Sequence, residues 1–128
     1  MNDKAEIRVL EPYAHGQFVE STDSPFGGRA HVHWLTGTAS TIMVGCVEGI
    51  LGMRPDSNGI EINPSIPSVW DKLTIEKIFR GKKLAITILN PNKKQSGVTK
   101  CVLNGEEIIG CYIEASKLKD KNTITITL

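Results

Sequence analysis

Residues 73–89 read LTIEKIFRGKKLAITIL, and this stretch decides the fold of the second half of the chain. Alternation of apolar with polar or small residues predicts strands with one buried face, and a glycine between two such runs predicts a turn. We therefore predict a β-hairpin around Gly81. The apolar positions that carry the pattern are Leu73, Ile75, Leu84, Ile86 and Ile88.

The same alternation continues toward the C-terminus. Asn104-Gly105 is a strong hairpin signal between residues 99–103 and 106–109. Residues 63–70, NPSIPSVW, predict an irregular connection that buries Trp70 at its end. Roughly six or seven short strands at this spacing predict an antiparallel β-sandwich. The tail NTITITL places three apolar residues on one face, opposite the threonines: Ile124, Ile126 and Leu128.

Before Pro55 the pattern is that of helices and loops. Glu11-Pro12 predicts the start of a short helix, because proline is tolerated in the first helical turn. Residues 21–28, STDSPFGG, predict a loop. The short helix is expected to bury a modest apolar face made of Tyr13, Phe18 and Val19.

Residues 39–53 predict a longer helix that is apolar around almost its whole circumference and stops between Gly52 and Pro55. A helix without a polar face is buried within a larger body, which this chain is too short to provide. We therefore infer that residues 1–54 are the last piece of a larger helical domain. In the chain alone, Ile42, Val47 and Leu51 are then expected to be exposed or covered by another chain.

Composition excludes several classes of protein. Hydrophobic residues make up 40% of the 128 residues and charged residues 23%, as in a globular protein with a core. A net charge of +1 with interspersed signs argues against nucleic acid as a partner. The first residues lack the apolar core of a secretory signal, and no run is long enough to span a membrane. We therefore expect a cytoplasmic protein.

The cysteine pattern agrees with a cytoplasmic location. The three cysteines lack metal-ligand spacing and predict reduced thiols, with a disulfide between Cys101 and Cys111 as the alternative. His15, His31 and His33 suggest a metal site at first sight. No cysteine or carboxylate completes the set, so we predict no metal.

Thr36-Gly37-Thr38 stands directly before the predicted apolar helix and has two possible roles. A threonine there is most often an N-cap that satisfies free backbone amides. The same amides and the helix dipole also favour a bound anion, which a glycine allows to approach closely. Nearby, Arg29, His33 and Trp34 are candidates for lining a site, although each also fits a role in the loop or the core.

Four stretches carry a resemblance to a known family: EPYAHGQF, GRAHVHWLTGTAS, VEGILGMRPDSNGIEINPSIPSVWDKLTIEKIFRGKKLAITILNP and GVTKCVLNG. Together, from Glu6 to Gly105 and in this order, they resemble the C-terminal end of glycoside hydrolase family 94. That family comprises inverting β-glucoside phosphorylases. In it, an (α/α)6-barrel holds the active site and a two-layered jelly roll closes the chain.

The resemblance implies an α+β chain in two parts. Residues 1–54 are expected to be the closing helices of an (α/α)6-barrel, and residues 55–128 an antiparallel, jelly-roll-like β-sandwich. The implied reaction is phosphorolysis of β-linked gluco-oligosaccharides to glucose 1-phosphate, with inorganic phosphate as co-substrate and no cofactor. The family's Thr-Gly phosphate contact transfers to Thr36 and Gly37.

The resemblance also implies what this chain lacks. The general-acid aspartate of the family belongs to a segment outside these residues, so the chain alone is expected to be inactive. Its expected partners are the remainder of the barrel and, in the intact protein, a second copy in a homodimer. The alternative function is a non-catalytic β-sandwich that binds a carbohydrate or another protein. The low aromatic content, 5%, argues against that alternative.

Overall fold

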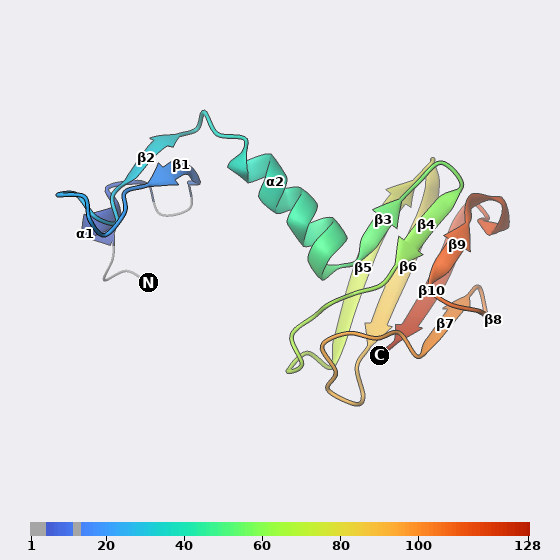
Figure 1. The fold of residues 1–128 in the computed structure, drawn as a ribbon. Helices are drawn as coiled ribbons and strands as arrows, with labels where there is room; N and C mark the ends of the chain where they lie inside the picture. The colour runs from blue at the N-terminus through green and yellow to red at the C-terminus, as the bar shows by residue number, and fades with distance from the viewer. Residues whose placement is uncertain (1–4, 12–13) are drawn as a thin grey trace. The chain divides into compact units, whose positions relative to one another are not determined.

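A computed structural model describes residues 5–11 and 14–128 and divides the chain into two compact units, Met1–Val44 and Gly45–Leu128. The second unit holds two β-sheets, and the first holds a two-stranded sheet and helical segments (Figure 1). Within the described residues, no helix has both the length and the apolar composition needed to cross a membrane.

The two sheets of the second unit enclose one core. The larger sheet has the strand order β5-β6-β10-β7-β8 and the smaller one β3-β4-β9. Ile60 and Ile113 of the smaller sheet lie in the same buried cluster as Ile86 and Ile126 of the larger one. The β-sandwich predicted from the alternation is therefore confirmed. The bounds are β3 (Met53–Pro55), β4 (Gly59–Ile62), β5 (Lys72–Phe79), β6 (Lys82–Leu89), β7 (Lys100–Leu103), β8 (Glu106–Ile108), β9 (Tyr112–Glu114), η3 (Ala115–Lys117) and β10 (Lys121–Thr127).

Both predicted hairpins are confirmed. Arg80 and Gly81 connect β5 to β6 with φ angles of 51° and 77°, and Asn104 and Gly105 connect β7 to β8 with φ angles of 52° and 91°. Positive φ at both central residues is the geometry that matches the twist of the flanking strands. Asparagine and glycine adopt this conformation at low cost, which explains why the second turn was so clear in the sequence.

Strand β10 fills the centre of the larger sheet. Its inward residues Ile124 and Ile126, and Leu128 after it, have no exposed surface, as the alternation predicted. The strand pairs with β7 antiparallel but with β6 parallel, from Lys121 opposite Lys83 to Thr127 opposite Leu89. The prediction of a purely antiparallel sandwich is therefore wrong for one pair. The chain between β6 and β10, which includes β7, β8 and β9, supplies the long crossover that parallel pairing requires.

The connection between β4 and β5 is irregular, as predicted, but it does not bury Trp70. Ile66 is the buried residue, 2% exposed, and its amide donates to the Gln95 carbonyl at 2.9 Å. Trp70 is 43% exposed and Val69 is 76% exposed. The prediction of a buried Trp70 is wrong because the hydrogen bond to the neighbouring loop brings Ile66, and not the tryptophan, under the sheets.

The cysteines are free thiols, as predicted. Cys101 is buried, and burial raises the pKa of its thiol to about 11. Burial also raises the pKa of Cys111, whose Sγ lies 3.7 Å from Glu61 Oε1. Both thiols are therefore protonated near neutral pH, which makes them poor nucleophiles.

The turn between β3 and β4 is organised by the Asp56 carboxylate. Its Oδ1 accepts hydrogen bonds from the amides of Asn58 and Gly59, both at 2.7 Å, and from the Tyr112 hydroxyl at 2.9 Å. These three donors, the Asn58 amide first, lower the pKa of Asp56. The ionised form is therefore favoured in the folded protein.

We expect Asp56→Asn to cost stability near neutral pH and to cost progressively less at acid pH. A carboxyl whose pKa is lowered on folding stabilises the protein above its unfolded pKa, and this contribution is lost as the pH falls through the folded pKa. The pH range in which this stabilisation is lost therefore lies below 3.8, the ordinary pKa of an aspartate. Urea unfolding of both proteins near pH 6 and near pH 2.5 measures the difference. An equal gap in the free energy of unfolding at both pH values would contradict the role of the charge.

The first unit contains α1 (Ala5–Arg8) and a short hairpin of β1 (Gly16–Val19) with β2 (Ala30–His33). Phe18 is paired with His31, and the two rings stack with their centroids 4.9 Å apart. The predicted helix with Phe18 and Val19 on a buried face is wrong, because both residues lie in β1 and are 50% and 62% exposed. Pro12 and Tyr13, where that helix was to begin, lie outside the described residues. Residues 21–28 form the predicted loop.

The apolar helix begins near its predicted start. Helix α2 (Thr38–Val44) ends the first unit, and the π-helix η2 (Gly45–Ile50) begins the second. Ile42 is 40% exposed, as expected for the chain alone. Val47 and Leu51, for which the same was expected, instead pack against the sandwich core. That expectation is wrong because only Leu51 and Gly52 separate η2 from β3, which brings this part of the chain onto the sheets.

Candidate functional site

Thr36 and Gly37 form the entry to helix α2. The Gly37 carbonyl accepts the first helical hydrogen bond, from the Thr41 amide at 3.1 Å. The hydroxyls of Ser40 and Thr41 donate to the same carbonyl at 2.8 and 3.1 Å. This convergence on one oxygen fixes the glycine at the start of the helix.

The Thr36 side chain caps the helix in part. Its Oγ1 accepts a hydrogen bond from the Thr38 amide at 3.1 Å and donates one to Thr38 Oγ1 at 2.8 Å. In the described part of the chain, the amides of Gly37, Ala39 and Ser40 have no hydrogen-bond partner. The cap thus satisfies one donor and leaves others free, as the first turn of a helix normally does.

Gly37 is open to its surroundings. The residue is exposed, and apart from Gly37 and its two chain neighbours no atom of the described chain lies within 4 Å of the position that a Cβ would occupy. Free amides at the start of a helix carry a partial positive charge and can donate to an oxyanion. The arrangement therefore has the donors and the access that an anion needs.

The segment before Thr36 has an unusual backbone. Val32 and Trp34 have φ angles of 52° and 68°, in the left-handed region that β-branched and bulky residues avoid. Such conformations often occur at functional sites, where surrounding contacts hold them. No feature of the sequence indicated them, because valine and tryptophan are among the residues least expected there.

The three candidate lining residues have different surroundings. Trp34 is 75% exposed, and Leu35 beside it is 83% exposed. Arg29 is half-buried, with its guanidinium 5.6 Å from the centre of the Phe26 ring. His33 ends β2 opposite Gly16, and its side chain lies outside what the structure describes. Among the described contacts, no hydrogen bond or ion pair links any of the three to Thr36 or Gly37.

The remaining histidine of β2 is engaged within the hairpin. His31 Nε2 lies 3.0 Å from Glu20 Oε1, while the ring stacks on Phe18. No cluster of three or more histidine, cysteine or acidic residues with metal-binding geometry occurs among residues 5–11 and 14–128.

Comparison with known families divides the chain near residue 52. Residues 1–52 match the glycosyl hydrolase 94 superfamily, catalytic domain, and residues 53–108 match the glycosyl hydrolase family 65, C-terminal domain. The first match contains the whole Thr36–Gly37 turn and η2. The second begins at β3 and ends with β8.

Individual relatives agree with these matches. An N,N'-diacetylchitobiose phosphorylase of Vibrio furnissii is 34% identical over 127 residues, which are 99% of this chain and 16% of the relative. A solabiose phosphorylase of Paenibacillus borealis is 32% identical over 100 residues, 78% of this chain and 13% of the relative. A 3-O-beta-D-glucopyranosyl-beta-D-glucuronide phosphorylase of the same organism is 36% identical over 84 residues, 66% of this chain and 11% of the relative. The chain thus spans less than a fifth of the length of these relatives.

Proposed function

Because the chain belongs to the glycosyl hydrolase 94 superfamily, we propose that it is the C-terminal portion of an inverting glycoside phosphorylase. Its substrates are β-linked gluco-oligosaccharides, cleaved with inorganic phosphate to glucose 1-phosphate. One observation carries the proposal: in the segment that matches the catalytic domain, the Thr36–Gly37 turn presents an exposed Gly37 with free amides at the start of a helix. The relatives, which are phosphorylases by name, support the class of reaction.

In the proposed reaction, a phosphate oxygen forms a bond to the anomeric carbon while the bond to the glycosidic oxygen breaks. A carboxylic acid protonates the leaving oxygen, as in inverting hydrolases, and phosphate takes the place of the attacking water. The anomeric configuration is inverted. The acid comes from the part of the enzyme outside this chain, so the chain alone has no phosphorolytic activity.

Thr36 and Gly37 are proposed to hold the phosphate. The Gly37 amide donates to one phosphate oxygen, and the absence of a side chain lets the anion approach the backbone. The Thr36 hydroxyl, which donates to Thr38 Oγ1 in this structure, can rotate to donate to the anion. The partial positive charge at the start of α2 adds a further stabilising contribution.

The rest of the proposed assembly follows from the family. Residues 1–54 close an (α/α)6-barrel, and residues 55–128 form its C-terminal β-sandwich. Arg29, His33 and Trp34 line the sugar or phosphate site once the barrel is complete. The intact enzyme is a cytoplasmic homodimer, and phosphate is its co-substrate, without a cofactor.

A phosphorolysis assay tests the proposal. The protein encoded by the reading frame that contains this chain, with its upstream part, is incubated with phosphate and a panel of β-linked disaccharides and oligosaccharides. Release of glucose 1-phosphate or a related sugar 1-phosphate by the intact protein, and none by residues 1–128 alone, is the expected result. Phosphate-independent hydrolysis by the intact protein would exclude the proposed reaction.

For the phosphate contact, we expect Thr36→Ala in the intact enzyme to raise the KM for phosphate by about 10-fold or more, because a hydrogen bond to a charged group is worth about 1.5–3 kcal/mol. Thr36→Ser, which keeps the hydroxyl, should stay close to the wild type. Thr41→Ala is the matched control, since its hydroxyl donates to the Gly37 carbonyl. An unchanged KM for phosphate in Thr36→Ala would exclude the contact.

A further inference from the structure

Val69 and Trp70 form an exposed apolar pair on the sandwich. Val69 is 76% exposed and Trp70 43%, although both belong to a unit with a well-filled core. Tryptophan is prominent among the residues that dominate protein interfaces, and here it lies beside a second exposed apolar side chain.

The backbone that carries this pair is held rigidly. The Trp70 amide donates to the Pro67 carbonyl at 3.0 Å, and the Trp70 carbonyl accepts from Asn90 Nδ2 at 3.1 Å. Asn90 is fully buried, and its own amide donates to the Asp71 carbonyl at 2.8 Å. The tryptophan is therefore presented in a fixed position, which lowers the entropy lost when a partner binds.

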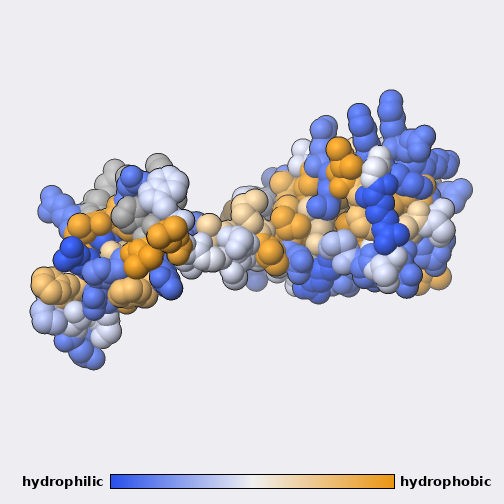
Figure 2. All heavy atoms as spheres, turned by 90° about the horizontal axis from the view of Figure 1, so that it is seen from above, coloured by the Kyte–Doolittle hydropathy of each residue, from blue (hydrophilic) through white to orange (hydrophobic). Residues whose placement is uncertain are grey.

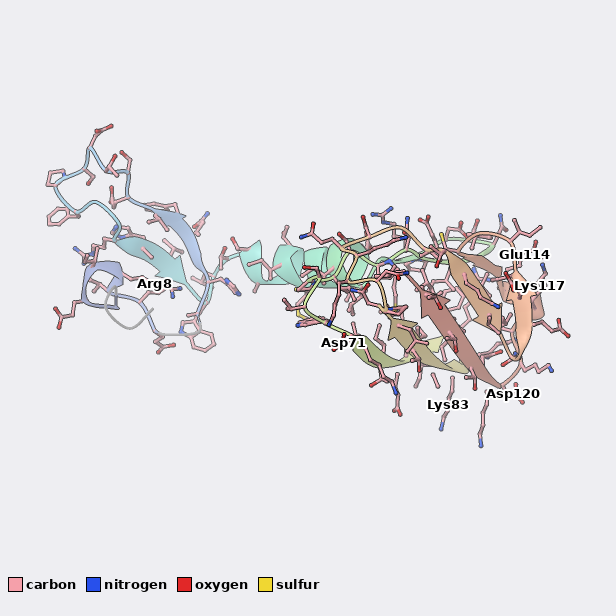
Figure 3. The ribbon with its side chains drawn as sticks, turned by 90° about the horizontal axis from the view of Figure 1, so that it is seen from below. Arg8, Asp71, Lys83, Glu114, Lys117 and Asp120 are labelled. Carbon is pink, nitrogen blue, oxygen red and sulfur yellow. The ribbon has the colours of Figure 1, made fainter. Side chains whose placement is uncertain are left out.

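The pair lies at the end of the sandwich where η2 joins it. The Ser65 amide, in the same connection, donates to the carbonyl of Ile50, the last residue of η2, at 2.9 Å. Asp71, the neighbour of Trp70, is seen at this end, whereas Lys83 lies toward the other end (Figure 3). Seen from above, the sandwich surface is mostly hydrophilic with scattered apolar residues (Figure 2). Ile50 is itself 43% exposed.

We propose that Val69, Trp70 and Ile50 form a docking surface for the part of the catalytic domain that lies outside this chain. The match to the catalytic domain ends at residue 52, so the chain passes from that domain into the sandwich at this end. The aligned 127 residues are only 16% of the phosphorylase relative, which leaves a large body to cover the surface. This inference rests on one part of the proposed function, namely that the chain belongs to a protein with a larger catalytic domain. It does not depend on the reaction which that domain catalyses.

The surface of the catalytic domain that docks here needs to be apolar, because Val69 and Trp70 carry no charge. An ion pair between Lys93 and Asp71 lies beside it and supplies a polar rim of the kind that surrounds an apolar contact.

The test compares one substitution in two contexts. Val69→Lys is made in residues 1–128 and in the intact protein, and the urea midpoint of the sandwich is followed in each. In the shorter chain no shift is expected, because the side chain is exposed. In the intact protein the lysine is forced into an apolar contact, and the midpoint should fall by roughly 1 M.

Ile78→Lys is the matched control. Ile78 is 69% exposed and pairs with Lys83, away from η2, so its substitution should shift neither midpoint. Equal shifts for Val69→Lys in both contexts, or none in the intact protein, would overturn the proposal. Self-association of residues 1–128 that Val69→Lys abolishes would also overturn it, in favour of a second copy as the partner. Because the readout is unfolding, an intact protein without phosphorolytic activity would refute the proposed function and leave this result standing.

Discussion

Replacement of Gly52 by alanine is expected to remove most of the stability of the sandwich. Gly52 joins η2 to β3 with a φ of 65°, and a Cβ at this position would lie 2.0 Å from the Asn63 carbonyl oxygen and 2.1 Å from its carbon. These are backbone atoms that cannot rotate away. The amide of the same Asn63 donates to the Gly52 carbonyl at 3.0 Å, so any shift also strains the bond that joins the two segments.

The cost has two parts. A left-handed conformation costs an alanine roughly 1–2 kcal/mol relative to glycine. Overpacking of a buried position typically adds about 1–3 kcal/mol, and the overlap at Gly52 is severe. Together they amount to about 2–5 kcal/mol, and the severe overlap places Gly52→Ala at the upper end, which equals the lower end of the about 5–15 kcal/mol that a typical domain has in total. Urea unfolding followed by circular dichroism should therefore show a greatly lowered midpoint or no folded baseline.

Gly97→Ala separates the two parts. Gly97 has a φ of 95°, but within the described chain no atom beyond Gly97 and its two neighbours lies within 4 Å of the position that a Cβ would occupy. The free energy of unfolding of Gly97→Ala should therefore fall only by the conformational cost, roughly 1–2 kcal/mol. If Gly52→Ala and Gly97→Ala lowered the midpoint equally, the close contact with Asn63 would have no energetic role.

The sequence was informative where local chemistry and tertiary structure agree. Asn104-Gly105 prefers the left-handed pair of conformations that its hairpin adopts, and the residues around Gly81 alternate because one face of each strand is buried. The same holds for the buried face of β10 at Ile124 and Ile126. Each of these features is decided within a few residues, so a pattern of period two or a turn dipeptide is sufficient to predict it.

The predictions from sequence were wrong where contacts between residues far apart in the chain determine the structure. Trp70 was expected in the core because it is large and apolar, but the bond from Ile66 to Gln95 in another loop determines which residue is buried. The parallel pairing of β10 with β6 depends on the path of three intervening strands. Phe18 was assigned to a helix, although its partner is His31 across a hairpin closed by a long loop. None of these partners is close in sequence.

The candidate site was predictable only in its local part. The turn at Thr36 and Gly37, its cap and its free amides follow from residues within a single helical turn. The left-handed backbone at Val32 and Trp34 does not, since their side chains disfavour it. Exposed Trp34 and Leu35 are consistent with a site whose other walls belong to the catalytic domain, which is the proposal that the Thr36→Ala experiment addresses.

Asn90 is the polar residue on which the loops at one end of the sandwich depend, a role that no sequence pattern indicates. Its side-chain amide donates to the carbonyls of Trp70, at 3.1 Å, and Lys94, at 2.7 Å. Its Oδ1 accepts from the Lys94 amide at 2.8 Å. With no exposed surface, the residue is reached by no solvent that could replace these bonds. A buried polar side chain of this kind stabilises the fold only while all its partners are present.

We expect Asn90→Ala to lower the free energy of unfolding by about 3 kcal/mol, since the variant removes a fully buried side chain and its three hydrogen bonds, each worth about 0.5–1.5 kcal/mol. Urea unfolding of residues 1–128 measures the loss, and Asn92→Ala, at an exposed position of the same loop, should change it by less than about 0.5 kcal/mol. Because Asn90 also fixes the Trp70 carbonyl, the variant should make the connection between β4 and β5 more susceptible to proteolysis. A loss no larger than that of Asn92→Ala would mean that water or neighbouring groups replace the three bonds, and that the rigid presentation of Trp70 has another cause.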